Sequence, residues 1–467
     1  MRVGNRQQAV IFFNQAVHAF NDKSNPNNMR LAYQLYASAC LQDPTWSDGW
    51  FQLGNANSEL GLWYTAVANW RQALTCEQAS ATDRAKILAN MSWRLHTIGR
   101  IPDALEAAEE AVRLDPQLHN TYINLSCIWQ ALDDAEKSLT YARKAFELAP
   151  DDVTGETALA FALLFARKFE EGYERFEARF PYKLRDYLQY PYPSWKGESD
   201  KTVYIVADQG LGDTLSYARF IEAACARSKY VHIRIQSELT RLFQHSFAHI
   251  KNLNLIPGLG VAAVGFPEAD AWSTFVSLPF ALKLTSEQVR NAKHITVPRW
   301  SVPSPLDWKS RDAKLHIGIA WRGSPLNDID RHRNLPLHLF FDLYRVPGIQ
   351  LYSLQVGEHA KEMHDIGGAA LIRDMTPYIR EVTDTIAVLN QLDLVITCES
   401  ALGHICALID KECWIPYSYM GRDYRIGLTG EDRLWCPHHR IFRQGSDQRW
   451  EPIFDQLVEA LKERLCE

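Results

Sequence analysis

Residues 86–116, KILANMSWRLHTIGRIPDALEAAEEAVRLDP, and residues 120–150, NTYINLSCIWQALDDAEKSLTYARKAFELAP, repeat one pattern at a fixed interval. Small residues and prolines keep this interval, as the pairs Ala111 and Ala145 or Pro116 and Pro150 show. Small residues let two antiparallel helices approach closely, large apolar residues fill the space between them, and a proline ends the second helix. The two stretches therefore predict consecutive helical hairpins.

The same interval continues outward from these two stretches. It separates Ala39 from Ala73, whereas the step from Ala73 to Ala111 is longer by a four-residue insertion at 79–82. A degenerate unit follows at residues 153–180. The interval matches the tetratricopeptide repeat (TPR), whose units are about 34 residues long. We therefore predict a helical solenoid of four to five TPR units over residues 1–180.

Stacked TPR units form a concave surface that can bind a partner. Four tryptophans of the repeats could line a peptide groove or pack between helices, and we favour packing because large rings fill such spaces. They are Trp50, Trp70, Trp93 and Trp129. The repeat pattern does not specify the bound partner.

Length, charge and cysteine content bound the class of protein. The chain has 467 residues, which favours two to three domains. Its net charge of −6 argues against non-specific nucleic-acid binding, which requires a basic surface. The nine cysteines include no Cys-x-x-Cys pair, which indicates a reducing compartment. Because residues 1–20 lack signal-peptide features and no stretch reaches ~18 apolar residues, we expect a cytoplasmic protein without a membrane span.

The pattern changes beyond an aromatic, proline-broken connector at residues 181–200. Short β-branched runs then alternate with helical stretches, which is typical of parallel α/β sheets. A polar linker near residue 300 divides this half into an N-terminal lobe (201–300) and a C-terminal lobe (301–467). The expected strands are 202–206, 230–235, 271–278, 316–321, 350–354, 392–397 and 412–416. Ligands of such folds bind at the carboxyl ends of the strands.

The first strand-end loop, QGLGD at residues 209–213, contains Gly210 and Gly212. Glycines permit a tight turn and a close approach of the backbone to a ligand. Asp213 could act as a general base that takes a proton from an acceptor hydroxyl. It could also be the N-cap of a helix that begins at Thr214, and the local sequence alone favours the cap.

The second loop, WRGSP at residues 321–325, is followed by a basic stretch that contains Arg331 and Arg333. Arginine side chains form paired hydrogen bonds with phosphate oxygens, so Arg322, Arg331 and Arg333 could contact a diphosphate. The alternative is a solvated loop with surface arginines.

The third loop, CESALGH at residues 398–404, follows a strand. At the start of the next helix, Ser400 would place a hydroxyl and backbone N–H groups where a diphosphate could lie. His404 lies one turn further along and could instead be a packed helical histidine. Because the neighbouring cysteines match no zinc spacing, we expect no bound metal.

Together these segments resemble the bacterial TPR-fused glycosyltransferases. The catalytic half of that family is similar to lipopolysaccharide heptosyltransferases and, more distantly, to O-GlcNAc transferase. The matching stretches are residues 193–197, 207–215, 317–324, 331–337, 353–355, 383–387 and 392–404. One stretch departs from the family pattern, because Glu399-Ser400-Ala401 stands where the family usually has Asp-Thr-Ala.

The resemblance implies a GT-B fold, a pair of Rossmann-like lobes, and an inverting, metal-independent transfer from a nucleotide sugar to a protein or glycan acceptor. It implies that Asp213 is the catalytic base and that no cofactor other than the nucleotide-sugar co-substrate is needed. The donor-binding residues that it implies are Gly210, Gly212, Trp321, Arg322, Ser324, Arg331, Arg333, Gln355, Glu399, Ser400, Gly403 and His404. It also implies that residues 201–300 form the acceptor-side lobe and residues 301–467 the nucleotide-sugar lobe, with the acceptor docked on the TPR array.

The alternative is a non-catalytic TPR scaffold with a degenerate nucleotide-sugar-binding half. The altered loop at Glu399 is the feature that favours it.

Overall fold

The computed structural model describes residues 5–76, 79–180, 191–259, 265–298, 309–323, 330–421, 423–426 and 434–466. The chain divides into two compact units, residues 1–166 and 167–467. The described part of the first unit is helical, and the second unit is built on two parallel sheets. No helix among the described residues is long and apolar enough to cross a membrane.

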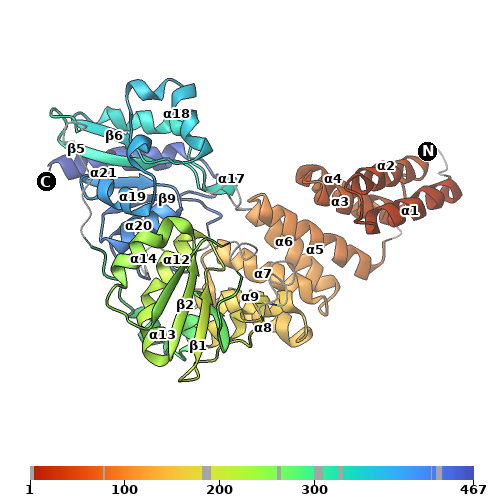
Figure 1. Ribbon diagram of the computed structural model, residues 1–467. Helices are drawn as coiled ribbons and strands as arrows, with labels where there is room; N and C mark the ends of the chain where they lie inside the picture. Colours follow the sequence, from red (N-terminus) through yellow and green to blue (C-terminus); the bar gives the residue numbers. More distant parts are fainter. Residues whose placement is uncertain are drawn as a thin grey trace. The chain divides into compact units, whose positions relative to one another are not determined.

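Helices of the first unit pack as consecutive pairs, α1 with α2, α3 with α4, α5 with α6 and α7 with α8 (Figure 1). Their bounds are α1 (Arg6–Asn21), α2 (Asn27–Gln42), α3 (Ser47–Glu59), α4 (Trp63–Thr75), α5 (Ala81–Thr97), α6 (Ile101–Leu114), α7 (His119–Ala131), α8 (Ala135–Leu148) and α9 (Val153–Phe165). The predicted array of TPR-like helical hairpins is therefore confirmed.

Small side chains allow these helices to approach closely. The periodic alanines Ala39, Ala73, Ala111 and Ala145 have no exposed surface. A Cβ on Gly54 of α3 would lie 2.4 Å from the indole nitrogen of Trp70 on α4. Trp70 is buried and donates a hydrogen bond from this nitrogen to the carbonyl of Phe51 at 3.1 Å.

The predicted packing role is wrong for one of the four tryptophans. Both Trp93 on α5 and Trp70 on α4 line a groove, but Trp93 is 39% exposed whereas Trp70 is buried between helices. Repeat spacing alone could not distinguish the two, because it does not determine on which side of the helix pair a ring lies.

The second unit contains two sheets in which every strand pair is parallel. The first sheet has the order β3-β2-β1-β4 and the second has the order β10-β9-β8-β5-β6-β7. Their strands are β1 (Thr202–Val206), β2 (Tyr230–Ile235), β3 (Leu253–Pro257), β4 (Ala271–Thr274), β5 (Leu315–Ala320), β6 (Ile349–Ser353), β7 (Arg373–Asp374), β8 (Leu394–Thr397), β9 (Cys413–Tyr417) and β10 (His439–Arg443).

Helices connect these strands, as expected for parallel pairing. The α-helices are α10 (Phe169–Phe176), α12 (Leu211–Tyr217), α13 (Ile221–Arg227), α14 (Thr240–Ser246), α15 (Leu278–Ala281), α16 (Ser286–Arg290), α17 (Asp330–Arg333), α18 (Lys361–Asp365), α19 (Val382–Leu389), α20 (Ala401–Leu408) and α21 (Glu451–Cys466). The 3-10 helices are η1 (Ala218–Phe220), η2 (Ser237–Leu239), η4 (Leu337–Arg345), η5 (Glu358–Ala360), η6 (Gly368–Ala370) and η7 (Thr376–Tyr378).

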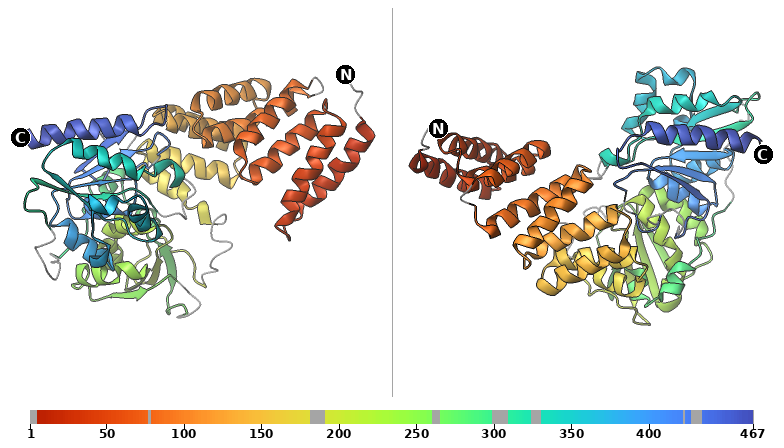
Figure 2. Two further views of the ribbon diagram at one scale, coloured as in Figure 1. Left: turned by 90° about the horizontal axis from the view of Figure 1, so that it is seen from above. Right: turned by 180° about the vertical axis from the view of Figure 1, so that it is seen from behind.

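The amphipathic C-terminal helix α21 covers the second sheet's core together with η4 (Figure 2). Leu457 and Leu461 of α21 are fully buried there. The predicted strands agree closely with β1, β2, β5, β6, β8 and β9, but sequence analysis missed β3, β7 and β10. β7 has only two residues, and β3 and β10 are edge strands with partly exposed residues, so none carries a strong apolar pattern.

Part of the predicted connector is described. Trp195 is buried, and its backbone N–H donates to the carbonyl of Trp272 in β4 at 2.7 Å. The connector therefore runs beside β4. Residues 181–190 of the connector and residues 299–308 of the interlobe linker lie outside the described residues. Helix α10, which the repeat pattern assigns to the solenoid, belongs to the second compact unit.

We predict that Gly54→Ala lowers the free energy of unfolding of the repeat array by about 1–3 kcal/mol, because the added methyl group forces α3 and α4 apart. Urea unfolding followed by circular dichroism measures the change. The control is Gly155→Ala, whose Cβ would approach nothing nearer than the end of the Asp152 carboxylate at 3.3 Å. An equal loss in both variants would contradict the close-packing explanation.

Candidate functional site

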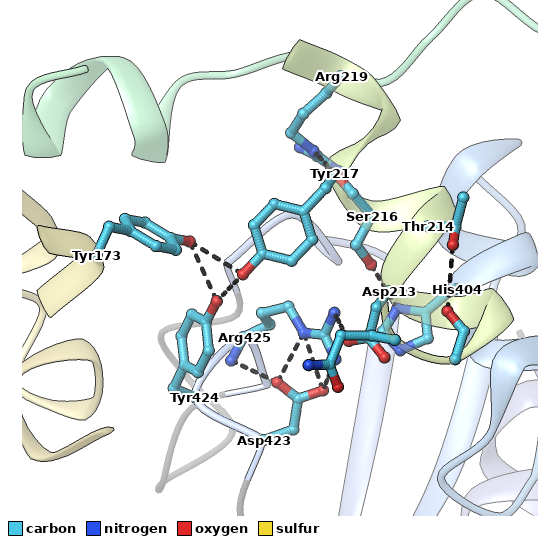
Figure 3. A network of polar contacts seen from close by, with 12 residues as sticks. Tyr173, Asp213, Thr214, Ser216, Tyr217, Arg219, His404, Asp423, Tyr424 and Arg425 are labelled. Atoms are coloured by element: carbon cyan, nitrogen blue, oxygen red, sulfur yellow. Dashed lines mark hydrogen bonds and ion pairs between the residues drawn. The ribbon is translucent and has the colours of Figure 1, made fainter. Parts of the chain in front are cut away.

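The first predicted loop joins β1 to α12. Gly210 is the N-cap position of α12 and Leu211 is its first residue, so Asp213 lies within the first turn. The N-cap interpretation of Asp213 is therefore wrong. Its carboxylate instead forms an ion pair with Nη1 of Arg425 at 2.9 Å (Figure 3).

Arg425 is held between two carboxylates. Its Nε donates to Oδ1 of Asp423 at 2.8 Å and its Nη2 donates to Oδ2 at 2.7 Å, while Nη1 faces Asp213. Burial acts to raise the pKa of Asp423, but the charge and hydrogen bonds of Arg425 outweigh it and lower that pKa. For Asp213, burial dominates and raises the pKa despite the opposing charge of Arg425. The paired hydrogen bonds to Asp423 fix the guanidinium in the orientation that reaches Asp213.

The third predicted loop joins β8 to α20, which begins at Ala401. The hydroxyls of Thr397 and Ser400 lie 3.2 Å apart at this helix start. His404 of α20 is half-buried, and its Nδ1 is 3.0 Å from the hydroxyl of Ser216 on α12. Burial, followed by the nearby Arg425, lowers the pKa of His404 to about 3, so the ring is neutral at physiological pH.

Helices α12 and α20 touch through a glycine. A Cβ on Gly212 would lie 2.4 Å from Cδ2 of His404, so any side chain at this position would displace the ring. Gly403 on α20 is less constrained, since its Cβ would meet Ile415 at 3.4 Å. The contact brings together the chain segments that follow the carboxyl ends of β1 and β8.

The second predicted loop follows β5 and is organised by two acceptors. Oε1 of Gln355 accepts hydrogen bonds from the backbone N–H groups of Trp321 and Arg322, at 3.0 and 2.9 Å. The carboxylate of Glu362 accepts from the indole N–H of Trp321 at 3.0 Å and pairs with Nε of Arg322 at 2.8 Å. Gln355 thus holds the loop backbone, and Arg322 is engaged by an acidic partner.

The basic stretch after this loop is described in part. Arg333 at the end of α17 is largely buried, and its guanidinium lies where a Cβ of Gly323 would be. Ser324 and the side chain of Arg331 lie outside the described residues.

A ring of tyrosines borders the site, and sequence analysis did not predict it. The hydroxyl of Tyr173 on α10 lies 3.2 Å from that of Tyr217 on α12 and 3.1 Å from that of Tyr424. The Tyr217 and Tyr424 hydroxyls also contact each other (Figure 3). Asp423 and Arg425 belong to a stretch that no sequence pattern connects to the other elements of the site.

Among the described residues, no group of three or more His, Cys, Asp or Glu side chains is placed to hold a metal ion. The structure thus brings Gly212, Asp213, Glu399, Ser400 and His404 into one region. It places Trp321, Arg322 and Gln355 in a second group around Glu362.

Comparison with known proteins gives distant relatives. Protein FlbA of Caulobacter vibrioides is 24% identical over 469 residues, which cover 94% of this chain and 76% of that protein. The STIP1 homolog of Dictyostelium discoideum is 40% identical over 75 residues, which are 16% of this chain and 13% of that protein. The likeness to FlbA therefore runs through both units. No protein-family model matches the chain.

Similar solved structures cover part of the chain. MamA of Desulfovibrio magneticus RS-1 has a TM-score of 0.33 and 17% identity over 38% of this chain and 97% of its own. YrrB, described as a TPR protein with an unusual peptide-binding site, has a TM-score of 0.30 and 14% identity over 39% of this chain and 90% of its own. The paired helices and the two parallel sheets of this chain themselves define a TPR-like array followed by an α/β region.

We predict that Gly212→Ala separates α12 from α20 and lowers the free energy of unfolding of the second unit by about 1–3 kcal/mol. Hydrogen exchange of the amides of both helices should accelerate. Gly210→Ala is the matched control in the same loop, because its Cβ would meet only the Asp213 carboxylate at 3.5 Å. Unchanged exchange in Gly212→Ala would show that the contact does not hold the helices together.

Proposed function

We propose that the α/β unit transfers a sugar from a nucleotide-sugar donor to a protein or glycan acceptor, with its two sheets acting as the lobes of a GT-B fold. The observation that supports this most is the junction of α12 and α20, which places Asp213 of one lobe against Arg425 of the other. Ligands of parallel α/β sheets bind at the carboxyl ends of strands, and two such ends face each other here.

The donor side would be the start of α20. Its backbone N–H groups and the hydroxyls of Ser400 and Thr397 suit the diphosphate of a nucleotide sugar. Arg333 is a nearby cation that could offset the negative charge of the departing diphosphate. In other enzymes a metal ion provides this charge compensation. The loop at Trp321 and Arg322, fixed by Gln355, would border the donor.

The acceptor side would be α12. An acceptor hydroxyl must lose its proton as its oxygen bonds to the anomeric carbon of the sugar. Two carboxylates are candidates for receiving the proton, Asp213 and Glu399, and burial raises the pKa of both.

The repeat array supports a second proposal, that it docks a polypeptide. A groove of about 400 Å³ in the first unit is lined by residues from several repeats. Asn55, Asn90 and Asn124 lie on its wall, and each follows the previous one by close to one repeat length. Asn90 donates to Oδ1 of Asn55 at 3.0 Å and Asn124 donates to the carbonyl of Ala89 at 2.9 Å, so these amides are fixed in place. Asn90 is also exposed, and an exposed amide, which both donates and accepts, suits an extended main chain. Exposed Trp93 adds an apolar contact surface.

A screen of UDP-, GDP-, CMP- and ADP-sugars tests the transfer. We expect hydrolysis of one donor class, and Asp213→Asn should lower that rate roughly 100-fold or more. The control is Asp455→Asn, which removes an exposed carboxylate on α21 that pairs with Arg345 of η4. It should leave the hydrolysis rate unchanged. Calorimetry against the same panel separates the hypotheses, because a chain that binds no member would be a scaffold.

Peptides that bind the full chain can be selected from a random library. We predict that Asn90→Ala lowers their affinity roughly 10-fold, about the value of one or two hydrogen bonds. Fluorescence polarisation measures the affinity. Lys86→Ala is the control, because Lys86 is exposed on the same helix and does not line the groove. Equal affinity of both variants would exclude the asparagine row as the peptide site.

A further inference from the structure

Glu399 follows β8 and stands directly before the helix start at Ser400. Its Oε2 has almost no exposed surface and makes no hydrogen bond to any residue that the structure describes. A buried carboxylate oxygen without a donor is costly, because it has lost water and gained nothing in return. Such an oxygen at a strand end therefore calls for a functional explanation.

The strongest charge effects on Glu399 from the described residues come from two acids and two cations. They are the carboxylates of Asp423 and Asp213 and the guanidinium groups of Arg333 and Arg425. The phenol of Tyr417 also senses Glu399. With Glu399 itself, the carboxylates of this described set outnumber its cations. This excess of acid favours one bound proton among the three.

Arg425 serves the other two carboxylates. It donates paired hydrogen bonds to Asp423 and forms an ion pair with Asp213 at 2.9 Å. Both oxygens of Asp423 and Oδ1 of Asp213 therefore have a cationic partner. Oε2 of Glu399 receives no such donor among the described residues, so the proton is best placed there.

We propose that Glu399 is the proton acceptor of the transfer reaction and that Asp213 is a positioning residue that holds Arg425. This inference rests on the proposed function. In the step, the acceptor O–H bond breaks and its proton moves to the carboxylate of Glu399, whose side chain is only half-buried as a whole. The acceptor oxygen forms the bond to the anomeric carbon, and the bond from that carbon to the phosphate oxygen breaks with its electron pair remaining on the nucleoside diphosphate.

The pKa of the Glu399 carboxyl supports its role as the proton acceptor. Burial, followed by the charge of Asp423, raises the pKa of Glu399 to about 7. A base whose pKa lies near the working pH combines a useful deprotonated fraction with a strong affinity for the proton. His404 is a further titratable group of the site, but burial lowers its pKa to about 3 and Ser216 occupies its Nδ1.

The first experiment needs no substrate. Infrared difference spectra of the whole protein, wild type against Glu399→Gln, should show a protonated-carboxyl band that disappears as the pH rises through about 7. Asp213→Asn should move this midpoint to lower pH, because it removes a neighbouring negative charge and leaves Arg425 with fewer partners. If no titrating band is lost in Glu399→Gln, the proposal is overturned.

The second experiment uses the sugar nucleotide that the donor screen selects. Glu399→Gln should lower turnover roughly 10²- to 10⁴-fold and remove the rise in kcat/KM between acid and neutral pH. Asp213→Asn should lower turnover but keep the rise in kcat/KM between acid and neutral pH. Glu399→Asp should also keep this rise, at a reduced turnover. A wild-type pH profile in Glu399→Gln, in a variant that still binds the donor, would overturn the assignment.

The two proposals fail in different ways. If the wild-type protein neither binds nor cleaves any sugar nucleotide, the transfer itself is wrong, and so is the role of Glu399 in it, even when the infrared band titrates. If wild-type turnover is present and Glu399→Gln leaves it unaltered, the transfer stands and only the choice of Glu399 is wrong.

Discussion

The close approach of α12 to α20 is the constraint on which the candidate site depends. Gly212 has no side chain, and the ring of His404 fills the space where one would be. The hydrogen bond between His404 and Ser216 then fixes the two helices relative to each other. Because α12 follows β1 and α20 follows β8, this one contact sets the separation of two strand ends from different sheets. Asp213 can reach Arg425 only while that separation is kept.

The repeat array uses the same physical device many times over. Alanines without exposed surface and Gly54 beneath Trp70 let paired helices come close enough for large side chains to interlock. In the array the device recurs once in every repeat, whereas at the candidate site it occurs at a single glycine. Close helix packing at small residues can be recognised in the sequence where it recurs, but not where it occurs once. The repeat array was therefore more predictable than the candidate site.

Much of the fold followed from the sequence because the determining signals were local or periodic. The helical hairpins followed from spacing, and β1 and β2 followed from short β-branched runs bounded by turn residues. Gly212, Asp213, Ser400 and His404 could be proposed because each lies just after a buried strand. Arg425 and Tyr173, which complete the site, could not be proposed from the sequence. They reach the site from distant segments that carry no periodic signal. The N-cap interpretation of Asp213 failed because α12 begins earlier than the local sequence indicated.

The ring of Tyr173, Tyr217 and Tyr424 has a consequence for how the adjoining segment is held. Burial raises the pKa of all three phenols, so the ring stays uncharged across physiological pH. Its bonds are therefore nearly indifferent to salt and to proton concentration, whereas the neighbouring guanidinium–carboxylate contacts are electrostatic. Tyr424 thus attaches this segment through uncharged hydrogen bonds, and Arg425 beside it attaches the segment through charged ones. Salt weakens only the second kind of contact, so high ionic strength should leave the attachment at Tyr424 intact.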